Sequence, residues 1–186
     1  MKYSFLEGRK IYLRPLEPAD RSFFLRWYND AETRARIGAP MPTCEPEADA
    51  LSRRTGQDCV WFAVVRRSDD KVVGETGLLR MFPAWQTTDL TIIIPDPQDQ
   101  GKRYGSEAVY LMMDYAFGYL GYHRIAIGVV GFNHSALAFY KKMGFQQEGV
   151  QEQGYYYNYQ YHDFIMMRIL REEFLPLREK VGLKHG

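Results

Sequence analysis

A loop with glycines and basic residues leads directly into a helical pattern in the segment QGKRYGSEA, residues 100–108. The first backbone N–H groups of a helix lack partners within the helix and carry a partial positive charge, so a phosphate group can satisfy them. Lys102 and Arg103 add cations to the same turn. The segment predicts a pyrophosphate site, but the glycine spacing alone favours a loop that only caps a helix, because it matches neither the Walker nor the Rossmann pattern.

A second pattern, VVGFNHSALAFYKKMGF at residues 129–145, follows the next expected strand. Asn133 stands where a helix begins, and Gly144 stands where that helix ends. Ala136 and Tyr140 lie one turn apart, so a ligand can approach the helix at the small side chain and meet the tyrosine hydroxyl. Taken alone, the pattern favours an ordinary packed helix with Tyr140 in the core.

The elements that must position these residues follow from hydrophobic periodicity and from turn residues. Strands are expected at residues 10–16, 59–67, 71–81, 87–96 and 124–130, and as a closing hairpin within 145–170. Helices are expected from a cap at Asp20 to about 29, in a weak pattern ending near 54, from 105 to about 120, and from Asn133 to Gly144. Pro15 cannot donate to a central ladder, so the first strand is expected at an edge. This order indicates an α+β fold with one parallel crossover at its centre.

Composition limits the class of protein. The chain has 186 residues, which suits one domain, and its net charge of +1 disfavours a nucleic-acid or anionic-membrane partner. Cys44 and Cys59 form no spacing typical of structural zinc or of a disulfide framework, and no metal is expected. No apolar run reaches the roughly 20 residues of a membrane helix, and the N-terminus lacks a signal-peptide core. We expect one cytoplasmic domain over residues 1–186, with a charged, partly loose tail at 171–186.

Together and in this order, the two patterns resemble those of the GCN5-related N-acetyltransferases, the GNAT superfamily. Residues 100–105 are similar to the family's acetyl-CoA loop, Gln/Arg-x-x-Gly-x-Gly/Ala, with Arg103 in place of the usual glycine. The family's later pattern is met in full by Asn133, Ala136, Tyr140, Gly144 and Phe145. If the loop needs a positive φ at Arg103, that residue is strained; if it does not, Arg103 adds a phosphate contact.

The resemblance extends over about residues 8–170. GRKIYLRPLEPAD and GYYYNYQYHDFIMMRI resemble the opening and closing segments of the branch that holds the ribosomal-protein alanine and spermidine N-acetyltransferases. It implies a mixed central sheet of about six to seven strands, a V-shaped splay between the fourth and fifth, and about four flanking helices. In the closing turn, Asn158-Tyr159 replaces the usual Asn-Gly, which makes a tight type I′ turn less favourable.

The same resemblance implies that acetyl-CoA binds in the V as co-substrate. An amine would then attack the thioester directly, without a metal or a covalent enzyme intermediate, while strand backbone groups polarise the thioester oxygen. The residues expected to contact acetyl-CoA are Ile92, Ile93, Ile94, Gln100, Gly101, Lys102, Arg103, Tyr104, Gly105, Ser106, Asn133, Ala136 and Tyr140.

Tyr140 is also the implied general acid, because a tyrosine with a pKa of about 10 stays protonated at neutral pH and can donate to the departing thiolate. Glu75 is the first candidate for the base, and Asp89 is a candidate for the base or for an amine anchor. Each of the two is also compatible with an ordinary strand carboxylate that faces solvent. A water chain, or a histidine such as His162, is a further option.

The acceptor is left open among a small amine, a polyamine, an aminoglycoside and a protein N-terminus. Arg80 follows Glu75 closely, which disfavours a polyamine. The residues expected to contact the acceptor are Trp27, Asp30, Asp89, Tyr157 and His162. Tyrosines alternate from 155 to 161, and core packing, a substrate wall and a homodimer surface are three interpretations of them.

Two functions from other classes compete with an N-acetyltransferase. A non-catalytic acyl-CoA-binding or regulatory domain would be expected to lose the tyrosine or the loop, and this chain keeps Tyr140 and most of the loop. An RNA- or ribosome-associated module is disfavoured by the nearly neutral charge.

Overall fold

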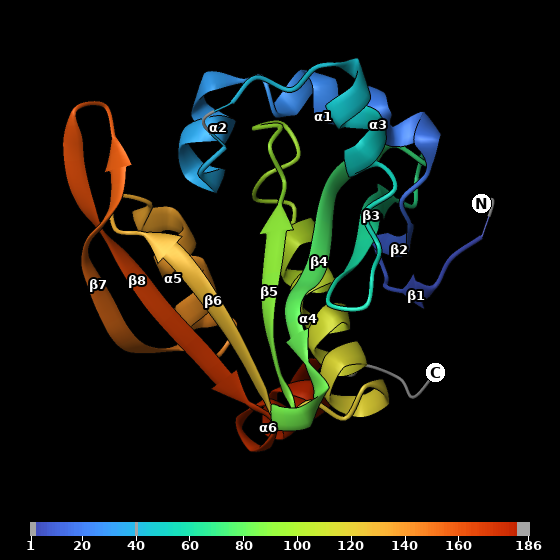
Figure 1. Ribbon diagram of the computed structural model, residues 1–186. Coiled ribbons are helices and arrows are strands. Elements are labelled where there is room, and N and C mark those ends of the chain that lie inside the picture. The colour runs from blue at the N-terminus through green and yellow to red at the C-terminus, as the bar shows by residue number, and fades with distance from the viewer. Residues whose placement is uncertain (1–2, 40, 182–186) are drawn as a thin grey trace.

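A mixed eight-stranded sheet forms the centre of the computed structural model, which describes residues 3–39 and 41–181 (Figure 1). Its strands are β1 (Leu6–Glu7), β2 (Ile11–Pro15), β3 (Val60–Arg66), β4 (Val72–Phe82), β5 (Thr87–Ile93), β6 (Arg124–Val130), β7 (Gln146–Tyr157) and β8 (Gln160–Leu170). The α-helices described are α1 (Arg21–Trp27), α2 (Ala31–Ile37), α3 (Glu45–Leu51), α4 (Tyr104–Asp114), α5 (His134–Lys142) and α6 (Arg171–Val181). The α+β class is confirmed. The strand beyond the expected six to seven is β1, whose two residues are too few to show a periodicity.

The sheet order is β1-β2-β3-β4-β5-β6-β8-β7. Strands β5 and β6 pair in parallel, and helix α4 lies in the crossover that connects them. Their pairing is short, because it joins only residues 87–89 to residues 124–126. On their outer sides, β4 pairs with β5 as far as Ile93 and β8 pairs with β6 over its whole length. Beyond Asp89 the two strands therefore diverge and open the expected V (Figure 1).

Among the described residues, apolar side chains form three clusters on the sheet, of which the two larger pack under the helices. The larger core joins α4, α5 and α6 to the strands, and it includes the fully buried Met112, Ile125 and Met167. The smaller core lies under α1 and α3, where Phe24 packs with Ala48. These helices lie across the end of the sheet at which β5 finishes (Figure 1). In the described part of the chain, every helix is too short or too polar to span a membrane.

Tertiary pairing overturns two local predictions near the N-terminus. The prediction of an edge strand at residues 10–16 is wrong, because β1 covers β2 through Leu13 and Tyr12. Pro15 lies beyond that pairing, so its missing N–H interrupts no bond to β1. The prediction that the Asp20 side chain caps the first helix is also wrong. Asp20 instead accepts two hydrogen bonds from the Arg14 guanidinium, at 2.8 and 2.7 Å.

The turn of the closing hairpin differs from its prediction. Asn158 and Tyr159 have φ values of 49° and 62°, and they connect the cross-strand pair Tyr157 and Gln160. Two consecutive residues with positive φ are the hallmark of a type I′ turn, which the sequence disfavoured. The long antiparallel pairing of β7 with β8 fixes the turn length, so it overrides the local preference of Tyr159.

The C-terminal segment is not loose over residues 171–181, where α6 forms. Phe174 is 1% exposed, and its ring lies 5.4 Å from the ring of Phe117. Arg178 pairs with Asp114 at the end of α4. The remaining tail residues, 182–186, lie outside the described residues.

Replacing Phe174 by alanine should lower the free energy of unfolding by about 3–5 kcal/mol, because it leaves a cavity in the larger core. Leu175→Ala is the matched control, since Leu175 is 50% exposed on the same helix, and its cost should stay below about 1 kcal/mol. Urea denaturation of both variants measures the difference. Equal effects would contradict the packing of α6 on the core.

Candidate active site

The edge of β5 that faces the V has no strand beside it. Ile92 and Ile94 pack into the larger core and Ile93 into the smaller one, so their side chains alternate across the sheet. Because β6 pairs with β5 only to Asp89, peptide groups of the rest of β5 point into the V without a ladder partner from β6. A ligand with its own amide groups can extend along this edge as a strand would.

The loop between β5 and α4 ends in a row of free amides. Within the described residues, the backbone N–H groups of residues 101–106 have no hydrogen-bond partner. The loop is closed by the side chain of Gln100, whose Nε2 donates to the Ile94 carbonyl at 3.0 Å. Gly101 supplies the turn with a φ of 73° and has open space beside it. These amides fit the pyrophosphate predicted from the sequence.

The two cations of the loop differ in their surroundings. Arg103 has a φ of 72°, so the loop does need a left-handed residue at this position, and the backbone of Arg103 is strained. Its side chain is exposed and forms no ion pair with any other described residue. Lys102, in contrast, lies 3.5 Å from the buried carboxylate of Asp99. Arg103 is therefore the loop cation that remains available to a phosphate.

Helix α5 begins and ends as its sequence predicts. The Asn133 side chain accepts hydrogen bonds from the Ala136 N–H at 3.2 Å and from the Ser135 hydroxyl at 3.0 Å. Gly144 follows the helix with a φ of 97°. The cap and the stop are confirmed, and they fix the start of α5 beside the end of β6.

Tyr140 lies on the inner face of α5. It is 6% exposed, and its ring packs against Phe139 and Phe145 at 5.1 and 5.7 Å. Its hydroxyl has no hydrogen-bond partner among the described residues. Burial raises the pKa of this hydroxyl well above its ordinary value, so it stays protonated at neutral pH.

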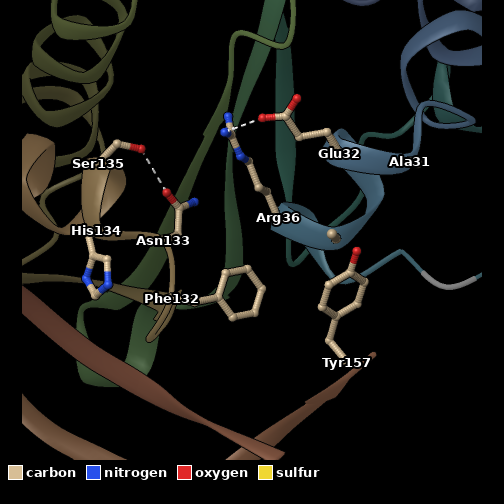
Figure 2. Close-up of a pocket in the computed structure, with 9 residues that line it drawn as sticks. Ala31, Glu32, Arg36, Phe132, Asn133, His134, Ser135 and Tyr157 are labelled. Atoms are coloured by element: carbon tan, nitrogen blue, oxygen red, sulfur yellow. Dashed lines mark hydrogen bonds and ion pairs between the residues drawn. The ribbon is translucent and has the colours of Figure 1, made fainter. Parts of the chain in front are cut away.

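A pocket of about 540 Å³ lies between α2 and the start of α5 (Figure 2). It is lined by Ala31, Glu32, Ala35, Arg36, Phe132, Asn133, His134, Ser135 and Tyr157. Two residues predicted from the sequence, Asn133 and Tyr157, both line this pocket. The ring of His162 lies 4.8 Å from the ring of Phe132, which is also in the lining. The Tyr155 hydroxyl donates to the Ala35 carbonyl at 2.7 Å and so attaches the hairpin to α2.

The α2 side of this pocket was missed by sequence reasoning. Glu32 and Arg36 form an ion pair one helical turn apart and face the space from α2 (Figure 2). Helix α2 is short, and its apolar residues do not form a periodic apolar face. The sequence therefore indicates this helix only through the residues at its two ends. Asp30 caps it by accepting from the Thr33 N–H at 2.9 Å, and Gly38 stops it with a φ of 69°.

Glu75 is buried, so the interpretation of a carboxylate facing solvent is wrong for this residue. It is 1% exposed and is bound by the Tyr28 hydroxyl and the Arg54 guanidinium. The same guanidinium lies 3.6 Å from the centre of the Trp61 ring. Burial raises the pKa of Glu75, while the positive charge of Arg54 acts against that rise.

The remaining predicted residues lie outside the pocket lining. Trp27 is half-buried beside Arg26, whose guanidinium lies 4.6 Å from its ring. Asp89 pairs with Arg80 near the closed end of the V. Asp30 is occupied as the cap of α2. Their contacts with an acceptor stay predictions. Among residues 3–39 and 41–181, no group of three His, Cys, Asp or Glu side chains is placed to hold a metal.

Replacing Arg103 by glycine should raise the free energy of unfolding by about 1 kcal/mol, because glycine adopts the left-handed conformation without the steric cost. Lys102→Gly is the control, since the backbone of Lys102 is not left-handed, and it should lower stability. Thermal unfolding of both proteins gives the comparison. A loss of stability in Arg103→Gly would contradict the strain.

Comparison with known proteins agrees with this geometry. A family model described as an acetyltransferase (GNAT) domain matches residues 10–146. The probable N-acetyltransferase YjcK of Bacillus subtilis is 27% identical over an alignment that is 187 residues long with its gaps. The alignment covers 90% of this chain and 98% of that protein. The spermidine N(1)-acetyltransferase of Escherichia coli K12 is 28% identical, and the alignment covers 94% of this chain and 94% of that protein.

Solved structures show the same fold. The spermidine N-acetyltransferase of Vibrio cholerae, in complex with CoA and spermine, superposes with a TM-score of 0.83 at 24% identity. The match covers 90% of this chain and 99% of that one. The V between β5 and β6, the loop of free amides and the family match over residues 10–146 lead to one conclusion. The chain belongs to the GNAT family of acetyltransferases and is an N-acetyltransferase.

Proposed function

We propose that this enzyme transfers an acetyl group directly from acetyl-CoA to a primary amine of a small molecule or of a protein N-terminus. The observation that carries the proposal is the unpaired edge of β5, which leads into the free amides of residues 101–106. Acetyl-CoA has the matching chemistry, because its pantetheine arm carries amide groups and ends in a pyrophosphate. The β5 edge holds the arm, and the loop amides hold the pyrophosphate.

Tyr140 is the proposed general acid. It packs in the same apolar cluster as Ile92 and Ile94 of β5, which supports this role. With a raised pKa and no competing hydrogen bond, its hydroxyl keeps the proton that a departing thiolate needs. Backbone groups of β5 polarise the thioester oxygen, and we expect Asn133 and Ala136, at the start of α5, to contact acetyl-CoA.

Water is the proposed proton acceptor for the amine. Both carboxylates that the sequence offered as bases are engaged, Glu75 with Arg54 and Asp89 with Arg80. A carboxylate that is already held by an arginine would have to give up that ion pair in order to accept a proton from the amine. Removal of the amine proton by Glu75 would also leave the Arg54 guanidinium, which is 20% exposed, without its partner.

The pocket between α2 and α5 is the proposed entrance for the acceptor. It contains one carboxylate, Glu32, and that group is already paired with Arg36. A polyamine carries several positive charges, so this lining supports an acceptor with a single amine better than spermidine, the substrate named for the Escherichia coli relative. Assembly as a homodimer stays a prediction.

A thiol-release assay with acetyl-CoA tests the function. Polyamines, aminoglycosides, amino acids and peptides with free N-termini are screened as acceptors, and products are identified by mass spectrometry. Release that depends on one of these classes supports the proposal and names the acceptor. Tight binding of acetyl-CoA without transfer to any acceptor would favour the non-catalytic binding domain instead.

Tyr140→Phe should lower kcat by about 10²- to 10⁴-fold, the usual contribution of a general acid, with the Kd of acetyl-CoA nearly unchanged. Tyr122→Phe is the control, because Tyr122 is equally buried at 3% exposure and its pKa is also raised by burial. Steady-state kinetics and calorimetry separate the two effects. An equal loss in both variants would show that Tyr140 only fills the core.

The pH profile of wild-type kcat/KM should rise as the acceptor amine loses its proton and then stay level to about pH 10. The physical reason is that burial raises the pKa of Tyr140, so the acid remains protonated over this whole range. Initial rates in overlapping buffers, at fixed ionic strength, give the profile. A fall between about pH 8 and 9 would mean that another group is the acid.

A further inference from the structure

Asp99 is a buried carboxylate in the phosphate loop that the proposed mechanism does not use. It is 2% exposed, in a segment whose neighbours Gln98 and Gln100 are exposed. Three cations surround it. Its oxygens lie 2.7 Å from Arg66 Nη1, 3.0 Å from Lys71 Nζ and 3.5 Å from Lys102 Nζ.

These ion pairs join segments that are distant in sequence. Arg66 ends β3, and Lys71 precedes β4, so both belong to the turn that connects these strands. Lys102 lies in the loop itself, next to the free amides. The Asp99 N–H also donates to the Asp96 carbonyl at 2.9 Å, which fixes the start of the loop. Asp99 thus attaches the phosphate loop to the β3–β4 turn.

The burial of this charge has an energetic consequence. Removing a carboxylate from water costs several kcal/mol, and only close partners of opposite charge offset that cost. Without the negative charge, Lys102 would lose its carboxylate partner, while Arg66 would keep Asp69 and Lys71 would keep Asp96. The three cations would then repel one another more strongly at the base of the loop. The loop would then lose the fixed arrangement of its free amides. A preorganised set of donors binds an anion more tightly than a mobile one.

We propose that Asp99 is a positioning residue for the pyrophosphate of the acetyl donor. It does not touch the donor; it fixes the amides of residues 101–106 and holds Lys102 at the base of the loop. Phosphate recognition in this chain then depends on the amides and on Arg103. The inference rests on the proposed use of acetyl-CoA.

The test compares two acetyl donors, acetyl-CoA and S-acetylpantetheine, of which only the first carries phosphates. Asp99→Asn keeps the size of the side chain and removes its charge. We expect the KM for acetyl-CoA to rise about tenfold, because misplaced binding groups lose affinity. We expect kcat at saturating acetyl-CoA and kcat/KM for S-acetylpantetheine to change less than about twofold, since neither depends on the loop once the acetyl group is in place.

Asp69→Asn is the matched control. Asp69 pairs with the same guanidinium, at 2.6 Å from Arg66 Nη2, but it lies in the β3–β4 turn and its side chain is 46% exposed. It should leave the KM for acetyl-CoA unchanged. Lys71→Met is a second variant, for use if Asp99→Asn does not yield folded protein. The side chain of Lys71 is 45% exposed, so its loss should not prevent folding. It should raise the same KM by a smaller factor.

The outcomes separate two failures. An unchanged KM for acetyl-CoA in both Asp99→Asn and Lys71→Met, or an equal loss with the two donors, overturns the positioning role of Asp99. If the wild-type enzyme neither binds nor uses acetyl-CoA, the proposed function itself fails, and the variants are not needed to show it. A rise in KM confined to acetyl-CoA and absent from Asp69→Asn supports the inference.

Discussion

The site depends on two parallel strands that pair for three residues and then separate. β4 holds β5 on one side and β8 holds β6 on the other, so both strands continue without each other beyond Asp89. Backbone groups that lose a ladder partner need another one. In the proposed function, the amide groups of the pantetheine arm would take the place of that partner. The loop with the free amides follows β5 in the chain, and the cap of α5 follows β6, so both come directly after the strands that form this opening.

Buried charges hold the elements around the opening in place. Glu75 joins Tyr28, at the end of α1, and Arg54, after α3, to the centre of β4. Asp99 joins the phosphate loop to the β3–β4 turn. Each carboxylate is almost fully buried and has cationic partners, so the loss of one partner would leave an uncompensated charge.

Local strain occurs where these elements are joined. Arg103 and Tyr159 both have positive φ, although each carries a side chain that disfavours it. Arg103 turns the loop toward the start of α4, and Tyr159 closes the hairpin that contacts α2 through Tyr155. In both places, the long-range pairing of the sheet offsets a cost of about 1–2 kcal/mol.

The sequence by itself determined the features that depend on residues within one or two turns. The cap at Asn133, the stop at Gly144, the parallel crossover and the loop ahead of α4 are local patterns, and the structure has each of them. They were enough to identify the family.

Only the tertiary structure decided the features that depend on distant partners. Asp20 binds Arg14 in place of capping its helix, and Glu75 is buried against Arg54 because α1 and α3 fold over β4. The α2 wall of the pocket depends on the hairpin contact from Tyr155. The physical reason is the same in each case: a charged or polar group takes the partner that burial brings to it, and sequence spacing does not encode burial.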